Sequence, residues 1–333
     1  MRYYSIGFAL LLACGCDTKN AAADATPTPV GALASTPVAA SGAMAASAPV
    51  AASASPPSSA MPMASGPAAP ATAAPAQADA SHLALNGKVI QGGLVVAKID
   101  GKVARIDFPG HRATVSDEGD LPIAFFRTAP ATEKMTIHFK DGSVLEHVFN
   151  VEQRTYAEEK ITGLPEDEVK LDPKATKANN SAEARIEVVR MKAGDKTCWK
   201  DGFHWPVVGK ITSHYGLTRV LNGTDGGVHW GVDIAVPTGT AIKAPACGTI
   251  VFAETGDPLS GTTLVLDHGH GVTSTFLHLS GFSKKVGDEV KQGDVVAKSG
   301  DTGRATGAHL DWRMNYFEVR VDPEMIAPPM GTK

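Results

Sequence analysis

Short runs of apolar and β-branched residues, separated by glycine-containing turns, recur from residue 83 onward. Turn pairs such as Asn86-Gly87, Asp100-Gly101 and Asp141-Gly142 divide residues 83–152 into short segments. Strands at this spacing are typical of a small sandwich. Within it, Met135–Val151 is predicted to fold as a hairpin about Asp141-Gly142.

Residues 153–196 are mainly polar and are predicted to connect two domains through one helix. Asp172-Pro173 suits a helix start, because proline is tolerated in the first turn. Ile186, Val189 and Met191 form one weak apolar stripe. The segment therefore has little apolar surface of its own to bury.

Residues 197–333 are rich in glycine and β-branched residues and form the predicted second, larger β domain. The candidate strands are Val207–His214, His229–Ala235, Ala241–Ala253, Thr262–Asp267, Val272–His278, Asp294–Ser299 and His309–Tyr316. The whole globular part is therefore expected to be mainly β, with a small N-terminal β-sandwich followed by a larger sheet domain.

The N-terminal quarter has a different composition. Residues 17–82 are rich in alanine, proline and serine, so they cannot bury enough apolar surface to fold and are predicted to be a disordered tether. Before them, Met1–Cys16 carries Arg2 and the short apolar run Ile6–Ala13. This run is too short to span a bilayer and has the length of a signal-peptide core.

Leu11-Leu12-Ala13-Cys14 resembles a bacterial lipobox, in which the cysteine becomes the lipidated first residue. Cys14 is the predicted acceptor, and Cys16 is the less favoured alternative. The other interpretation is a cleaved secretory peptide with two incidental cysteines. A diacylated, N-acylated cysteine would carry enough buried methylene groups for stable membrane anchoring.

The balance of charged residues argues against one class of function, and the remaining cysteines suggest a covalent link. The chain has 31 basic and 35 acidic residues, a balance that gives no electrostatic reason to expect nucleic-acid binding. Outside the N-terminal segment only Cys198 and Cys247 remain. In an oxidising compartment they are predicted to form a disulfide, with two free buried thiols as the alternative.

The candidate chemistry lies in the C-terminal domain. His229 and Asp233 would share one face of a strand, as would His309 and Asp311, because alternate residues point the same way. Two adjacent strands could then direct all four side chains into one groove, and His278 ends a third strand nearby. Imidazole and carboxylate ligands suit zinc, with one position left open for water.

These segments resemble the M23 family of zinc metallopeptidases, the lysostaphin/LytM type, over about 120 residues from Trp205 to Ile326. The matching segments are His229 and Asp233 for H-x-x-x-D, Phe276–Leu279 for Y/F-x-H-L, and Gly307–Asp311 for G-x-H-L-H. The resemblance implies an antiparallel β-sheet peptidase domain that holds one zinc ion per chain. It also implies metal ligands at His229, Asp233 and Asp311, and catalytic roles for His278 and His309.

Asp311 departs from the family pattern, which has histidine as the third ligand. Aspartate also binds zinc, but a second carboxylate leaves less positive charge on the metal and should weaken it as a Lewis acid. Ligation by His309 itself is a further possibility. Arg219 stands where related sequences carry arginine, and contact with substrate or a plain surface position are both open for it.

The leading hypothesis is a zinc-dependent endopeptidase that cleaves peptide cross-links of peptidoglycan. A lipid would anchor it to a membrane, on the periplasmic side of the outer membrane. The main alternative is a degenerate, metal-free domain of the same type that binds and activates a cell-wall amidase. A third interpretation is a lipoprotein that only ties the membrane to the wall.

Overall fold

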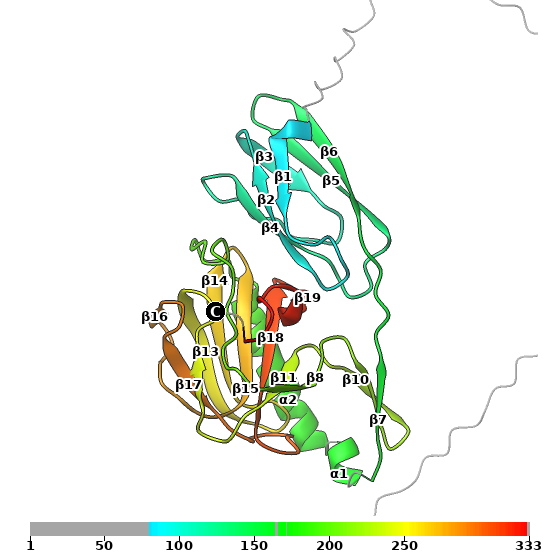
Figure 1. Ribbon diagram of the computed structural model, residues 1–333, viewed down its shortest axis with the longest axis vertical. Coiled ribbons are helices and arrows are strands. Elements are labelled where there is room, and N and C mark those ends of the chain that lie inside the picture. Colours follow the sequence, from blue (N-terminus) through cyan, green and yellow to red (C-terminus); the bar gives the residue numbers. More distant parts are fainter. Residues whose placement is uncertain (1–79, 164–165, 171, 332–333) are drawn as a thin grey trace, which may run out of the picture. The chain divides into compact units, whose positions relative to one another are not determined.

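The computed structural model describes residues 80–163, 166–170 and 172–331 (Figure 1). The predicted signal segment, the lipid acceptor Cys14 and nearly all of the predicted tether lie outside these residues. The described part is mainly β with a large antiparallel sheet, which confirms the fold class expected from the sequence. No helix within it is both long and apolar enough to cross a bilayer.

Residues 83–150 hold two three-stranded antiparallel sheets. One has the order β1 (Leu83–Asn86), β2 (Leu94–Ile99), β4 (Asp120–Ala124); the other has the order β3 (Val103–Asp107), β5 (Thr132–Phe139), β6 (Val144–Asn150). In β5 the alternate residues Met135, Ile137 and Phe139 are buried, and they join Phe149 of β6 in one apolar cluster. This alternation is the reason the segment folds as a two-layered unit with its own core.

The segment that follows contains β7 (Glu158–Ile161), α1 (Glu166–Val169) and α2 (Pro173–Arg190). The helix α2 begins where the sequence indicates, because the Asp172 side chain accepts a hydrogen bond from the backbone N–H of Ala175. The strand β7 was not expected. It pairs in parallel with β9 (Thr218–Leu221), which in turn pairs with β10 (Thr224–Val228).

The large sheet has the order β16-β13-β14-β15-β18-β11-β8, with β12, β17 and β19 attached to it. Its strands are β8 (Lys210–Ser213), β11 (Val232–Ala235), β12 (Ala241–Lys243), β13 (Gly248–Asp257), β14 (Gly261–Gly269), β15 (Val272–Phe282), β16 (Glu289–Val290), β17 (Val295–Ser299), β18 (His309–Tyr316) and β19 (Val319–Val321). All of their pairings are antiparallel. The strands that carry the candidate residues, β11, β18 and β15, are direct neighbours.

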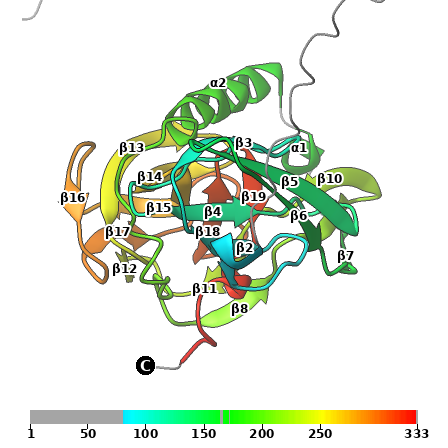
Figure 2. The same ribbon diagram turned by 90° about the horizontal axis from the view of Figure 1, so that it is seen from above.

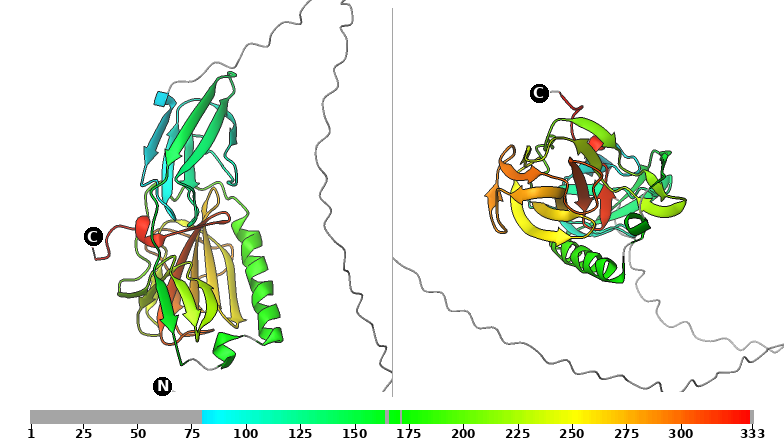
Figure 3. Two further views of the ribbon diagram at one scale, coloured as in Figure 1. Left: turned by 90° about the vertical axis from the view of Figure 1, so that its right-hand side faces the viewer. Right: turned by 90° about the horizontal axis from the view of Figure 1, so that it is seen from below.

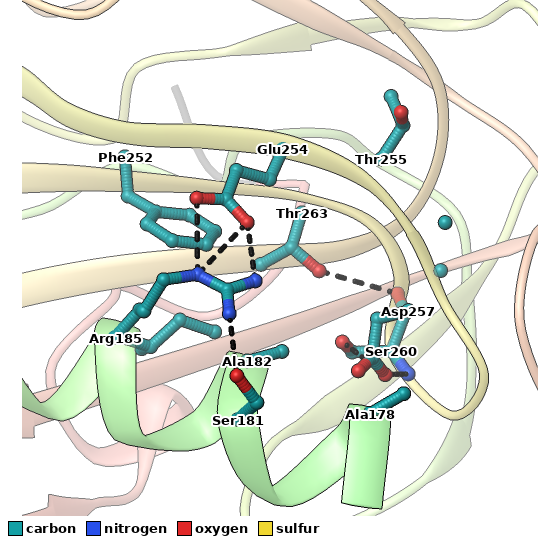
Figure 4. A pocket seen from close by; sticks show the side chains of 13 residues that line it. Ala178, Ser181, Ala182, Arg185, Phe252, Glu254, Thr255, Asp257, Ser260 and Thr263 are labelled. Carbon is teal, nitrogen blue, oxygen red and sulfur yellow. Dashed lines mark hydrogen bonds and ion pairs between the residues drawn. The ribbon is translucent and has the colours of Figure 1, made fainter. Parts of the chain in front are cut away.

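The helix α2 lies along this sheet beside β13 and β14 (Figures 2 and 3). Ile186 packs with Phe252 and Val265 in a small apolar cluster. Beside it, Arg185 forms an ion pair with Glu254, and a cavity of about 270 Å³ opens between the helix and the β13–β14 hairpin (Figure 4). The helix is therefore part of the C-terminal structure and more than a spacer.

Three expected strands differ from the structure. The strand expected over Val207–His214 is shorter, because β8 spans only Lys210–Ser213. Ala241–Ala253 is interrupted, because β12 ends at Lys243 and β13 begins at Gly248. Pro245 lies in the gap, and proline cannot donate a hydrogen bond to a sheet ladder. His229 also lies outside a strand, since β11 begins only at Val232.

The sulfur atoms of Cys198 and Cys247 are joined by a disulfide bond in the structure, as the sequence led us to expect. Cys198 lies in the turn that follows α2, and Cys247 directly precedes β13. The backbone N–H of Cys198 also donates to the carbonyl of His268 in β14. The bond therefore links the segment that follows α2 to the start of β13 in the large sheet.

Candidate active site and metal centre

Strand register brings two carboxylates face to face. Asp233 of β11 lies directly opposite Asp311 of β18, and Asp311 lies opposite Leu277, the residue before His278 in β15. Directly opposed residues in an antiparallel pair have side chains about 5 Å apart. The pairing of β11, β18 and β15 thus gathers the candidate residues at one place.

His229 reaches this place from the loop before β11. Its backbone N–H donates to the carbonyl of Leu217, and its own carbonyl accepts from Gly216. The ring Nδ1 lies 3.1 Å from the carbonyl oxygen of His214, which can only accept, so Nδ1 carries a proton. The other ring nitrogen, Nε2, is therefore directed toward Asp233 Oδ1 at 3.0 Å and Asp311 Oδ2 at 3.7 Å.

These three side chains fit a metal ion. Their ligand atoms all lie within 4.8 Å of one another, and His229 and Asp311 are only 3% and 2% exposed. His229 Nε2 and Asp233 Oδ1 are buried without a hydrogen-bond partner among the described residues, although they face each other. Buried polar atoms normally have partners, and one imidazole with two carboxylates is a donor set that zinc accepts.

The charges in the site favour ionised groups. Burial opposes protonation of His229, but the carboxylates of Asp233 and Asp311 outweigh it and raise the pKa of His229 to about 9. Burial also opposes ionisation of Asp311, yet Arg313 and His229 hold the pKa of Asp311 well below its usual range. A metal ion would have to displace the proton from His229 before binding to it.

Arg313 covers the second carboxylate. Its Nε lies 3.1 Å from Oδ1 and 3.0 Å from Oδ2 of Asp311, and its Nη2 donates to Oδ2 at 2.6 Å. Gly231 leaves room for this pair, because a Cβ atom there would stand 2.3 Å from Asp311 Oδ1 and 2.7 Å from Arg313 Cγ. Glycine is therefore required where the chain passes the pair.

His278 and His309 stand next to each other, with ring centroids 4.7 Å apart. Nδ1 of His278 lies 2.8 Å from the carbonyl oxygen of Thr302, and Nδ1 of His309 lies 2.7 Å from that of Gly307. Both Nδ1 atoms therefore carry a proton. Burial lowers the pKa of His278, so its ring is neutral at neutral pH.

Arg219 lies at the other ligand carboxylate. Its Nη2 donates to Asp233 Oδ2 at 3.0 Å and to Ser213 Oγ at 3.0 Å, and its Nε donates to Glu159 of β7 at 3.1 Å. Arg219 thus holds one oxygen of Asp233 and leaves Oδ1 facing His229. Contact of Arg219 with a substrate stays a prediction.

A cavity of about 330 Å³ is lined by Asp233, His278, His309 and Asp311. Its lining also includes Glu159 and Ile161 of β7 and Asn179 and Glu183 of α2. The segment 153–196, which the sequence analysis treated as a connector, therefore contributes to the site.

Sequence reasoning missed two groups here. Arg313 follows His309 and Asp311 at the same two-residue spacing in β18, so strand alternation alone places it on their face. A search restricted to metal ligands passes over it because arginine has no lone pair to offer. Glu159 carries no comparable signal, because only the parallel pairing of β7 with β9 brings it to Arg219.

Known proteins share this part of the chain. The model of peptidase family M23 matches residues 227–323. The DD-carboxypeptidase/endopeptidase Mpg of Neisseria meningitidis is 36% identical over 102 residues, which are 31% of this chain and 23% of that protein. Lysostaphin of Staphylococcus staphylolyticus is 38% identical over 100 residues, which are 30% of this chain and 21% of lysostaphin.

A structural relative extends beyond the matched segment. A crystal structure assigned to peptidase M23 from Pseudomonas aeruginosa has a TM-score of 0.56 and 27% identity, and the match covers 72% of this chain and 94% of that one. The chain spans only between a fifth and a quarter of the length of the two curated relatives. Residues 227–323 of this chain form a domain of peptidase family M23.

Proposed function

We propose that the protein is a zinc-dependent endopeptidase that cleaves peptide cross-links of peptidoglycan. The observation that carries the proposal is the convergence of His229, Asp233 and Asp311, whose ligand atoms are buried and lie within 4.8 Å of one another. Two further histidines, His278 and His309, line the same cavity, and their Nδ1 atoms are held by backbone carbonyls. Ligands and proton carriers lie side by side, as a metallopeptidase requires.

His229, Asp233 and Asp311 would hold the zinc ion. Bound there, zinc supplies a Lewis acid that polarises a peptide carbonyl and makes water a better nucleophile. The neutral ring of His278 accepts a proton at Nε2 while its Nδ1–H stays fixed on the carbonyl of Thr302. His309 stands beside it and, once protonated at Nε2, can donate to an oxyanion that develops on the substrate.

The substrate class rests on the relatives and on the shape of the site. Mpg is a DD-carboxypeptidase/endopeptidase, and the segment that carries the candidate ligands matches the model of peptidase family M23. The cavity is bordered by acidic and basic side chains, Glu159, Glu183 and Arg219, which suits a peptide with charged groups. We further propose a lipid anchor at Cys14 and a location on the periplasmic side of the outer membrane.

A second function is favoured by one specific contact. Both oxygens of Asp311 accept hydrogen bonds from Arg313, so this carboxylate has a partner without a metal. A domain whose third ligand is satisfied in this way could serve as a metal-free module that binds and activates a cell-wall amidase. The two functions differ in whether the wild-type protein holds zinc.

The test is zinc content and cross-link cleavage on purified peptidoglycan, measured on the same preparations. Wild type should hold about one zinc per chain, and Asp311→Ala should lose zinc and cleavage together, because two ligands rarely retain zinc. Asp311→Asn is the variant of similar volume, and Asp301→Ala in an exposed loop is the control that should change neither. Far-ultraviolet circular dichroism shows whether each variant is folded.

Two results would contradict the proposal. Full zinc and activity in Asp311→Ala would show that Asp311 is not a ligand, and His309 would then be tested by the same substitution. A wild type that holds no zinc and cleaves nothing, while Asp311→His gains both, would favour the amidase-binding module.

A further inference from the structure

The structure points to Arg313 as a residue that sets the charge of the metal site. We propose that Asp311 and Arg313 act as one electrically neutral unit, which takes the place of a neutral third ligand. The inference rests on the proposed zinc site and deepens it, because it names the residue that compensates for a second carboxylate. Arg313 is a positioning residue in this proposal, since it acts through Asp311.

The contact geometry is that of a dedicated pair. Three donor–acceptor distances between 2.6 and 3.1 Å join the guanidinium of Arg313 to both oxygens of Asp311. The two side chains are only 19% and 2% exposed, so solvent screens the pair weakly. Each carboxylate oxygen has two lone pairs, so Asp311 can accept from Arg313 and still offer an electron pair to a cation.

Among the charged contacts around the site, the pair of Asp311 and Arg313 is the one that changes the net charge of the ligand set. A neutral His229 with Asp233 and Asp311 would give the ligand set two negative charges, and Arg313 reduces them to one. Arg219 reaches Asp233 but is itself balanced by Glu159 at 3.1 Å. With Arg313 included, the site has the charge of a set with one carboxylate and two neutral ligands.

The position of Arg313 follows from the strand. Asp311 and Arg313 are two residues apart in β18 and share a face, so the guanidinium of Arg313 lies next to the carboxylate of Asp311. On the far side, Glu183 faces Arg320 at 3.8 Å and Arg190 at 4.0 Å. That carboxylate already has two arginine neighbours, which leaves Asp311 as the hydrogen-bonded acid of Arg313.

A purely supporting role for Arg313 predicts the opposite result from charge compensation. If Arg313 only holds Asp311 in place, its removal should weaken zinc binding. If it cancels charge, its removal adds one net negative charge beside a divalent cation and should strengthen zinc binding. The sign of the change in zinc affinity therefore separates the two roles.

The experiment measures the zinc dissociation constant of the full-length protein by competition with a chromogenic chelator. Arg313→Gln should bind zinc at least about tenfold more tightly than wild type, as expected for one charge a few ångströms from the ion. Arg313→Lys keeps the charge and should stay near wild type. Arg185→Gln removes a comparable arginine–carboxylate contact outside the site and is the matched control.

Asp311→His/Arg313→Gln restores the wild-type charge with a different ligand. Its affinity for zinc should lie closer to wild type than that of either single variant. The acid limb of the pH–rate profile should move to higher pH in Arg313→Gln and return toward the wild-type position in the double variant, which loss of structural support alone would not produce.

Weaker or unchanged zinc binding in Arg313→Gln would overturn the inference. If that variant does not fold, because a buried carboxylate loses its partner, the comparison of Asp311→His with Asp311→His/Arg313→Gln decides instead, and equal affinities would overturn it. A wild type that binds zinc but does not cleave peptidoglycan would contradict only the proposed function. A wild type that binds no zinc would contradict both the proposed function and the role of Arg313.

Discussion

Two buried histidines of this domain have pKa values shifted in opposite directions. His229 faces two carboxylates, which raise its pKa to about 9 against the effect of burial. His268 is fully buried between the carbonyl of Cys247, at 2.7 Å from Nδ1, and the hydroxyl of Ser274, at 2.8 Å from Nε2. Burial lowers the pKa of His268 to about 4. The partner, and not burial itself, separates a candidate metal ligand from a structural histidine.

His268 should make the folded protein sensitive to acid. Its pKa is about 4 when folded and 6.5 as the ordinary value, so the unfolded chain binds the proton first. Stability present above pH 6.5 should fall progressively as the pH is lowered to 4, by up to about 3 kcal/mol. The measurement is the free energy of unfolding by urea at each pH.

His268→Gln should show a flatter dependence of stability on pH over that range, because glutamine does not titrate. His204→Gln, at an exposed position, is the control and should keep the wild-type slope. An identical slope in wild type and His268→Gln would show that His268 does not carry the effect.

Sequence alternation located most of the candidate site at this scale. His309 and Asp311 lie on one face of β18 as predicted, and cross-strand pairing adds Asp233. The reasoning placed His229 in the same strand as Asp233, whereas the loop before β11 delivers it. The side chains of His229 and Asp233 still meet, because the loop before β11 directs His229 toward Asp233.

At the scale of elements, local signals were reliable and distant ones were not. The start of α2 was predictable because Asp172 caps the helix through a contact three residues away. The parallel pairing of β7 with β9 joins residues that are 60 positions apart in sequence, such as Glu159 and Arg219. No local sequence pattern near Glu158–Ile161 predicts this pairing. The break between β12 and β13 likewise depends on their different partners, because β12 pairs with β17 and β13 pairs with β14.

The disulfide is the covalent link between such elements, and its removal should be costly. Cys198 and Cys247 are 49 residues apart, and closing a loop of that length constrains the unfolded chain by about 4 kcal/mol. Cys198→Ser/Cys247→Ser should lose a free energy of unfolding of that order. Peptide mapping without reductant should recover the two cysteines linked.

Reduced wild type is the internal control, since it should unfold at the same urea concentration as the serine variant. If reductant leaves the midpoint of wild type unchanged, or if mapping finds two free thiols, the bond does not form in the native protein.

At the scale of the whole molecule, the candidate site residues and the predicted anchor lie in different parts of the sequence. The chemistry lies in residues 227–323, the segment shared with peptidase family M23. The alanine- and proline-rich residues 21–80 contain only two charged residues, Asp24 and Asp79. If the proposed anchor and the proposed tether exist, a long flexible tether would let one anchored domain reach many bonds of an immobile wall.

The lipid anchor is the whole-molecule prediction. If Cys14 is the acceptor, Cys14→Ser should abolish incorporation of a labelled fatty acid and release the protein from membranes into the soluble fraction, because the acyl chains supply the buried methylene groups that hold it there. Cys16→Ser is the matched control and should keep both the labelled fatty acid and its association with membranes. Label that survives in Cys14→Ser but disappears in Cys16→Ser would identify Cys16 as the acceptor, and label in neither wild type nor variants would show that the protein is not lipidated. Zinc content and cleavage by the purified Cys14→Ser protein should equal wild type, since the anchor changes where the domain acts and not how.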